Sequence, residues 1–137
     1  MANVKAIIDA MMEKDYFSQW LQAERVEERE GYCKLRMVVR KEMCNGFEIA
    51  HGGITFSLAD SALAFASNSH GQMAVSIETS ISHLKPVKTG DTLIAAAKEK
   101  HLSKRLGIYE VEIVNQHGEK VALFKGTVFR KEESWGF

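Results

Sequence analysis

The chain has 137 residues, and its 18 lysine and arginine residues balance 18 aspartate and glutamate residues, so the formal net charge is zero. A chain of this length builds one hydrophobic core and has little surface left for a deep cleft of its own. Balanced charge, with no window dominated by basic residues, argues against nucleic-acid binding. We therefore expect one domain over residues 1–137, and any elaborate site to be shared between copies of the chain.

Targeting and metal-binding patterns are absent from the sequence. The first residues hold no apolar signal segment and no run of 18 apolar residues occurs, which predicts a cytoplasmic protein without a membrane span. Cys33 and Cys44 lie eleven residues apart without a CxxC pattern, which favours two reduced thiols over a disulfide or a zinc site. Because the histidines are scattered, we expect no metal.

Hydrophobic periodicity predicts the elements in chain order. Apolar residues three and four apart predict a short amphipathic helix over residues 3–13. A period of two predicts a β-hairpin over residues 20–40, and the later run 54–69 is apolar on all sides, as in a buried helix. Alternation then returns four times, which predicts strands over residues 75–81, 93–97, 108–114 and 121–129.

This order of elements predicts an α+β fold. Consecutive strands with short connections form antiparallel sheets, and a helix that is apolar all round has to be covered by such a sheet. We therefore expect an antiparallel sheet of five or six strands wrapped around the long central helix. The short N-terminal helix packs against this unit.

Asp60 is the one charged residue between Gly52 and Ser69. Its neighbours three and four positions away are mostly apolar, and burying an ionised carboxylate is costly unless partners compensate. Two interpretations stay open at this point. The carboxylate is satisfied by backbone donors or by solvent at a helix end, or it is a base or nucleophile in apolar surroundings.

The start of the central helix, His51-Gly52-Gly53, is the second candidate site. Glycine lets a substrate approach the backbone, and the free amides of a first helical turn can bind a developing oxyanion. The alternative is that the glycines only permit a tight turn. Gly52 and Asp60 are eight residues apart, about 12 Å along a helix, so one carbonyl cannot contact both. If both act on one carbonyl, they come from two copies related by a two-fold axis.

Four further residues are weaker candidates. Asn45, in the loop before the helix, can orient a water or a substrate group, although Asn-Gly is also a common turn dipeptide. Ser76, at the start of a strand, can donate a hydrogen bond near the helix carboxylate, or is an ordinary edge residue. Lys104 and Arg105 form a basic pair that suits either a phosphate or a solvated turn.

Two stretches of the chain resemble a known family. Residues 45–68, with His51-Gly52-Gly53 followed by Leu58-Ala59-Asp60, resemble the HGG…LAD signature of hotdog-fold acyl-CoA thioesterases, closest to the phenylacetate-degradation (PaaI) type. Residues 109–118 and 121–130 are similar to the last two strands of that branch, so the resemblance covers roughly residues 15–131. It implies a hotdog fold, dimers with active sites at the interface and commonly tetramers. It also implies hydrolysis of an acyl-CoA, such as phenylacetyl-CoA or its ring-hydroxylated form, without a cofactor.

The resemblance implies a role for each matching residue. Asp60 matches the catalytic carboxylate, acting as nucleophile or as base for water, and Gly52 matches the residue whose amide polarises the thioester carbonyl. Asn45 matches the side chain that positions the carbonyl or the lytic water. Ser76 matches a hydroxyl near the carboxylate, and His51 a histidine that orders the loop.

Two alternatives to a hydrolase stay open. A hotdog dehydratase or hydratase pairs a histidine, for which His51 is available, with an acid on the substrate. A non-catalytic acyl-CoA-binding module needs no carboxylate on the helix. The central carboxylate and the double glycine favour thioester hydrolysis over both.

Overall fold

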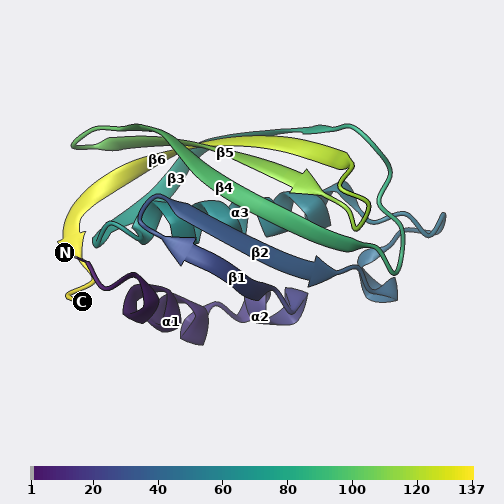
Figure 1. Cartoon of the computed structure of the whole chain (residues 1–137), viewed down its shortest axis with the longest axis horizontal. Helices are drawn as coiled ribbons and strands as arrows, with labels where there is room; N and C mark the ends of the chain where they lie inside the picture. The colour runs from purple at the N-terminus through teal and green to yellow at the C-terminus, as the bar shows by residue number, and fades with distance from the viewer. Residues whose placement is uncertain (1) are drawn as a thin grey trace.

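The computed structural model describes residues 2–137, so Met1, the first residue of the expected domain, lies outside the described residues. Helices and strands follow one another along the chain in the order seen in Figure 1. They are α1 (Val4–Lys14), α2 (Tyr16–Leu21), β1 (Glu24–Arg29), β2 (Tyr32–Val38), the 3-10 helix η1 (Lys41–Met43), α3 (Gly52–Asn68), β3 (Gln72–His83), β4 (Thr92–Leu102), β5 (Leu106–Val114) and β6 (Lys120–Ser134).

The N-terminal helix forms where the spacing predicted it, but a second helix follows it. The expectation that a hairpin starts at residue 20 is wrong, because residues 16–21 form α2 and β1 begins at Glu24. Asp15 caps α2, since its carboxylate accepts hydrogen bonds from the amide and the hydroxyl of Ser18. Gln22, in the left-handed conformation with φ of 57°, ends the helix.

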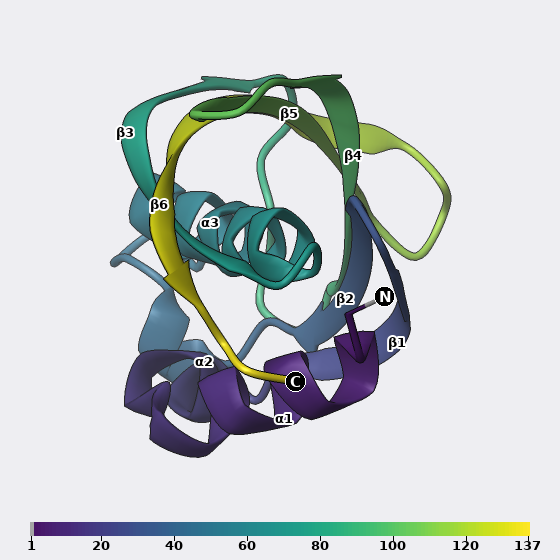
Figure 2. The same cartoon turned by 90° about the vertical axis from the view of Figure 1, so that its left-hand side faces the viewer.

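The six strands form one antiparallel sheet in the order β1-β2-β4-β5-β6-β3. Figure 2 shows this sheet curling around α3, with α1 and α2 beneath the helix. The predicted hotdog fold is thus confirmed, with six strands. Not all consecutive strands pair, since β3 lies beside β6 and residues 84–91 lead across to β4. β3 is therefore an edge strand of 12 residues.

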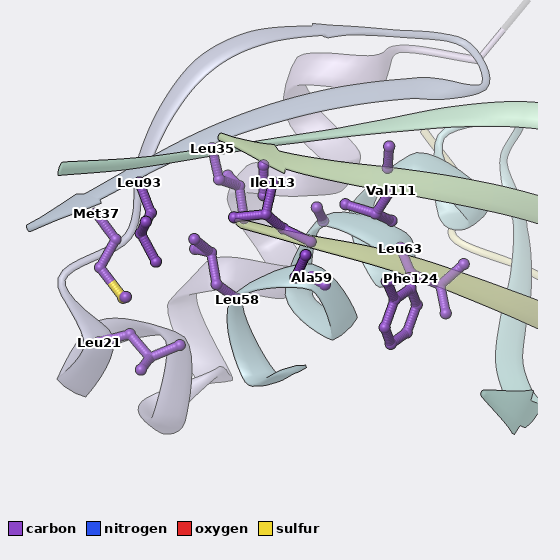
Figure 3. Packing of buried hydrophobic residues seen from close by; sticks show 14 of the residues in the cluster. Leu21, Leu35, Met37, Leu58, Ala59, Leu63, Leu93, Val111, Ile113 and Phe124 are labelled. Carbon is purple, nitrogen blue, oxygen red and sulfur yellow. The ribbon is translucent and has the colours of Figure 1, made fainter. Parts of the chain in front are cut away.

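The core lies between α3 and the concave face of the sheet. Figure 3 shows Leu58, Ala59 and Leu63 of α3 among buried side chains from four strands and from α2. The surrounding residues are Leu21, Leu35, Met37, Leu93, Val111, Ile113 and Phe124. This burial explains why α3 is apolar on nearly every side.

One stripe of α3 nevertheless stays partly exposed. Phe56, Asp60 and Ala64 are four residues apart, which places them on one face of the helix, and each is only half-buried. Beside them on the edge strand, Val75 and Ile77 are 52% and 59% exposed. An open helix stripe next to an unpaired strand edge is a surface suited to pairing with another chain.

Candidate active site

Asp60 lies in the middle of α3, facing a pocket that β3 and β6 complete. The pocket is lined by Leu63, Ala64, Ser67, Ala74, Val75, Ser76 and Val128. The carboxylate is half-buried, and no hydrogen bond to it is found within residues 2–137. Asp60 lies away from both ends of α3, and no backbone donor in the described part of the chain satisfies its carboxylate. The arrangement leaves this carboxylate available to react with a ligand in the pocket.

The surroundings of Asp60 shift its acidity. Burial raises the pKa of the Asp60 carboxyl, and the negative charge of Asp15 at the start of α2 raises this pKa further. A buried hydrogen bond of 2.7 Å between the hydroxyls of Ser18 and Ser61 holds α2 against α3. A carboxyl whose pKa is raised beside an apolar pocket is typical of a catalytic acid or base.

Gly52, the first residue of α3, lies in a different pocket. This second pocket is lined by Ile49, Ala50, Thr55, His83, Leu84, Lys85, Pro86 and Val87. Within residues 2–137 the Gly52 amide donates no backbone hydrogen bond, as is usual in a first helical turn. The His51 side chain makes no capping bond either. The positive end of the α3 dipole is thus open to a ligand.

The two pockets share no lining residue. One chain therefore keeps the Gly52 amide and the Asp60 carboxylate apart. This agrees with their separation of eight residues along the helix axis.

His83, at the end of β3, is a site residue that the sequence reasoning missed. A Cβ atom built onto Gly52 would lie 3.0 Å from Nε2 of His83, so the imidazole packs directly against this glycine. β3 places the ring there through its pairing with β6, opposite Ala122. Because the proximity arises only when β3 closes over the start of α3, no local sequence signal announces it.

Asn45 forms a turn in the loop before α3. Its Oδ1 accepts hydrogen bonds from the amides of Phe47, at 2.9 Å, and Ile49, at 3.3 Å. The turn-forming role left open by the sequence is therefore realised, while the Nδ2 group is left to donate. Asn45 lines a separate shallow pocket together with Lys41, Cys44, Gly46, Glu48 and Thr89.

Three further predicted residues lie in the Asp60 pocket or beside Gly52. Ser76 lines the pocket of Asp60, and His51 and Gly53 are exposed at the start of α3 beside Gly52. Their placement leaves each of them accessible to a ligand.

The basic pair lies away from both pockets. Lys104 and Arg105 occupy the turn between β4 and β5 and line neither of them. The Arg105 guanidinium donates to the carbonyl oxygen of Arg130 and pairs with the carboxylate of Glu132. Arg105 thus has structural partners, and Lys104 is the exposed cation of the pair.

Three general patterns are absent from residues 2–137: a metal-binding cluster, a membrane-spanning helix and a disulfide. Within this range no three histidine, cysteine, aspartate or glutamate side chains gather as a metal-binding group. None of the helices in the same range is long and apolar enough to cross a bilayer. Cys33 and Cys44 are both free.

The fold is that of the hotdog class, and comparison with known proteins identifies the family within this class. Residues 47–122 match the family model described as the thioesterase superfamily, and the chain belongs to this family. A putative esterase of Archaeoglobus fulgidus is 44% identical over 96% of this chain and 86% of its own length. The acyl-coenzyme A thioesterase PaaI of Escherichia coli is 43% identical over 88% of this chain and 86% of its own.

Solved structures agree with the sequence comparison. The structure of the E. coli PaaI protein from the phenylacetic acid degradation operon matches with a TM-score of 0.93 and 40% identity, over 96% of this chain and 95% of that chain. A Streptococcus mutans protein bound to acetyl CoA matches with a TM-score of 0.79 and 29% identity, over 82% of this chain and 90% of that one. This chain is therefore a thioesterase of the PaaI type.

Proposed function

We propose that this chain hydrolyses acyl-CoA thioesters to a free acid and coenzyme A, with phenylacetyl-CoA or its ring-hydroxylated form as substrate. The observation that carries the proposal is the half-buried Asp60 carboxylate, which has no hydrogen-bond donor within residues 2–137 and faces an apolar pocket. Leu63, Val75 and Val128 in that pocket suit an apolar acyl group. The 43% identity to PaaI supports an aromatic one.

Asp60 attacks the thioester carbonyl as a nucleophile, or removes a proton from the water that attacks it. The electron pair of the C=O bond moves to oxygen, where the Gly52 amide stabilises the negative charge. When the carbonyl re-forms, the C–S bond breaks and coenzyme A leaves as a thiolate. On the water route this step gives the free acid directly. On the nucleophile route the acyl group is left on Asp60 as a mixed anhydride, which a water then hydrolyses to the free acid and the Asp60 carboxylate. Ser76 supplies a hydroxyl in the pocket of the carboxylate, and the Nδ2 group of Asn45 positions the carbonyl or the water.

The two groups meet in a two-fold dimer. On α3, Phe56 lies midway between Gly52 and Asp60. On β3, the midpoint between Ser76, in the Asp60 pocket, and His83, in the Gly52 pocket, lies near residues 79–80. When a two-fold axis relates two copies of one helix or strand so that they pair antiparallel, the axis passes beside the midpoint of each copy. The dimer axis therefore passes near Phe56 of α3 and near residues 79–80 of β3.

Both midpoints lie at nearly the same level of the molecule. The ring of Phe56 contacts the ring of Phe124 at a centroid distance of 5.2 Å, and Phe124 is the register partner of Ile81 on β3. One axis at this level pairs two β3 edges and also sets Gly52 of one copy beside Asp60 of the other. This supports a homodimer with two shared sites, and two such dimers would give the tetramer expected from the family resemblance.

Release of free thiol from a panel of acyl-CoA substrates tests the proposed function. We expect the highest kcat/KM with phenylacetyl-CoA or a ring-hydroxylated form, and lower values with straight-chain substrates. A chain that binds these compounds without releasing thiol is a binding module instead. Hydration of an enoyl-CoA in place of thiol release indicates a hydratase.

Removing the charge of Asp15 is expected to shift the acidic limb of the pH–rate profile to lower pH. Asp60 has to be ionised to act, so activity falls as the pH drops through its raised pKa. Because the Asp15 charge contributes to that elevation, Asp15→Asn lowers the pKa of Asp60. Asparagine retains the oxygen that caps α2, so the helix is kept. Profiles of kcat/KM against pH for both proteins check this, and a limb that stays in place or moves upward contradicts it.

A further inference from the structure

The imidazole of His83 is a polar group of the Gly52 pocket for which the mechanism above has no task. The rings of His70 and His117 are hydrogen-bonded to Glu99 and Gln116, whereas within residues 2–137 no hydrogen bond engages the ring of His83. Its side chain is exposed to solvent and lines the same pocket as Gly52. The ring is therefore available to a ligand that enters this pocket.

We infer that His83 is a second hydrogen-bond donor to the thioester oxygen, acting beside the amide of Gly52. This inference rests on the proposed function and assigns a catalytic residue to the same site. It makes His83 the partner of the backbone amide in an oxyanion hole, with one donor from the start of α3 and one from the end of β3.

The positions of the two donors allow one oxygen to reach both. A Cβ atom on Gly52 would lie 3.0 Å from Nε2 of His83, and a backbone nitrogen lies about 2.5 Å from the Cβ atom of its own residue. The Gly52 nitrogen and Nε2 are therefore at most about 5.5 Å apart. Since an oxygen accepts a hydrogen bond from an N–H donor at about 2.7–3.2 Å, a single oxygen can bridge this distance.

The same contact makes glycine favourable at the start of α3. A Cβ atom at this position would be in tight contact with the imidazole, which would have to shift by a few tenths of an ångström. A Cβ atom on Gly53, the next residue, would meet nothing within 4 Å, so close packing is specific to Gly52. Gly52 thus keeps both the backbone and the ring close to the oxygen.

His83 needs no proton transfer in this role. As the carbonyl carbon is attacked, the electron pair of the C=O bond moves to oxygen and the hydrogen bond from Nε2 strengthens. The proton stays on the imidazole throughout. When the electron pair returns to the carbon, the C–S bond breaks and the thiolate of coenzyme A carries the negative charge away.

Two variants separate hydrogen bonding from ring packing. His83→Phe keeps a ring against Gly52 but removes the donor, and we expect kcat for phenylacetyl-CoA to fall about 10- to 100-fold, with KM changing less than about threefold. His83→Gln retains an N–H donor and is expected to keep more activity than His83→Phe. The matched control is His101→Gln, because His101 is an exposed histidine on β4 that lies outside the pocket. We expect this variant to retain the wild-type kcat.

The outcomes separate this inference from the proposed function. Loss of kcat in His83→Phe, with partial recovery in His83→Gln, supports the second donor. Unchanged kcat in His83→Phe, or equal losses in both variants with raised KM, overturns it while the hydrolase assignment stands. If the wild-type chain releases no thiol from any acyl-CoA, the proposed function itself fails.

Discussion

The Asp60→Asn variant is expected to hydrolyse phenylacetyl-CoA at least about a hundredfold more slowly than the wild-type chain, the scale expected when a positioned nucleophile or base is lost. Asparagine has nearly the same shape as aspartate, so the acyl pocket formed by Leu63, Val75 and Val128 is preserved. What disappears is the negative charge that attacks the carbonyl or activates water. We therefore expect the loss in kcat, with little change in KM.

The same variant is expected to be at least as stable as the wild type. Burial raises the pKa of Asp60, which means that the folded chain holds its proton more tightly than the unfolded chain. Stability therefore falls as the pH rises through this pKa, and a neutral asparagine avoids that loss at neutral pH. A melting temperature below that of the wild type contradicts this account of the site.

Asp9→Asn is the matched control for these measurements. Asp9 is an exposed aspartate on α1 that pairs with Lys5 and Arg25, far in the sequence from α3. We expect thiol release by this variant to remain at the wild-type rate. Near-wild-type hydrolysis by Asp60→Asn in the same assay rejects Asp60 as the reacting carboxylate.

Gly126→Val is expected to destabilise the fold by roughly 1–3 kcal/mol, the usual cost of overpacking a core. Gly126 lies on β6 against the side chain of Leu63 on α3. A Cβ atom there would lie 2.6 Å from Cδ2 of Leu63, a side chain that is 1% exposed, so something has to shift. Valine is more favourable than glycine in a β-strand, so only this steric conflict makes the substitution unfavourable.

Thermal melts at equal protein concentration measure the effect. We expect the Tm of Gly126→Val to fall by roughly 5–10 °C. In a Leu63→Ala background the same substitution is expected to cost less, because the clashing atom is gone. Gly46→Ala is the control, since a Cβ atom at Gly46 meets nothing within 4 Å. A Gly126→Val chain as stable as the wild type contradicts the close packing of sheet and helix.

Elements with a strong hydrophobic period were predictable from the sequence. The spacing of apolar residues located α1 to within one residue at each end, and the apolar surroundings of Leu58 and Leu63 identified α3 as a buried helix. Alternation located β3 to β6, although the strands run longer than predicted. In each case a face buried against the core imposes the period that the sequence displays.

α2 was not predictable in the same way. Its six residues make less than two turns, too few to show a helical period. The cap formed by Asp15 and Ser18 is the one local signal that marks its start. Trp20, which belongs to α2, also lies under the guanidinium of Arg40, a contact that only the tertiary structure provides.

Strand order and the full site also depend on tertiary structure. Neighbouring strands in sequence are often neighbours in a sheet, but residues 84–91 carry the chain away from β3, so that β3 pairs with β6. Gly52 and Asp60 could be singled out as candidates from the sequence, because glycine and an isolated carboxylate are conspicuous in an apolar helix. His83 was not, because it reaches Gly52 only through the folding of β3 over α3.

A mixed dimer brings the roles of Gly52 and Asp60 into one experiment. Gly52→Pro removes the amide hydrogen at the first position of α3, where proline fits the helix. Gly52→Ala, which keeps the amide, is its control and is expected to retain more activity. Copies carrying Gly52→Pro and copies carrying Asp60→Asn are co-expressed with different affinity tags, and dimers that hold one of each are purified through both tags.

Thiol release from phenylacetyl-CoA by these mixed dimers is the most direct test of an active site shared between chains. In each mixed dimer, one site combines an intact Gly52 with an intact Asp60 and the other site combines both substitutions. The shared site predicts that each parent is nearly inactive and that mixed dimers regain up to half of the wild-type rate. Mixed dimers as inactive as both parents would contradict it.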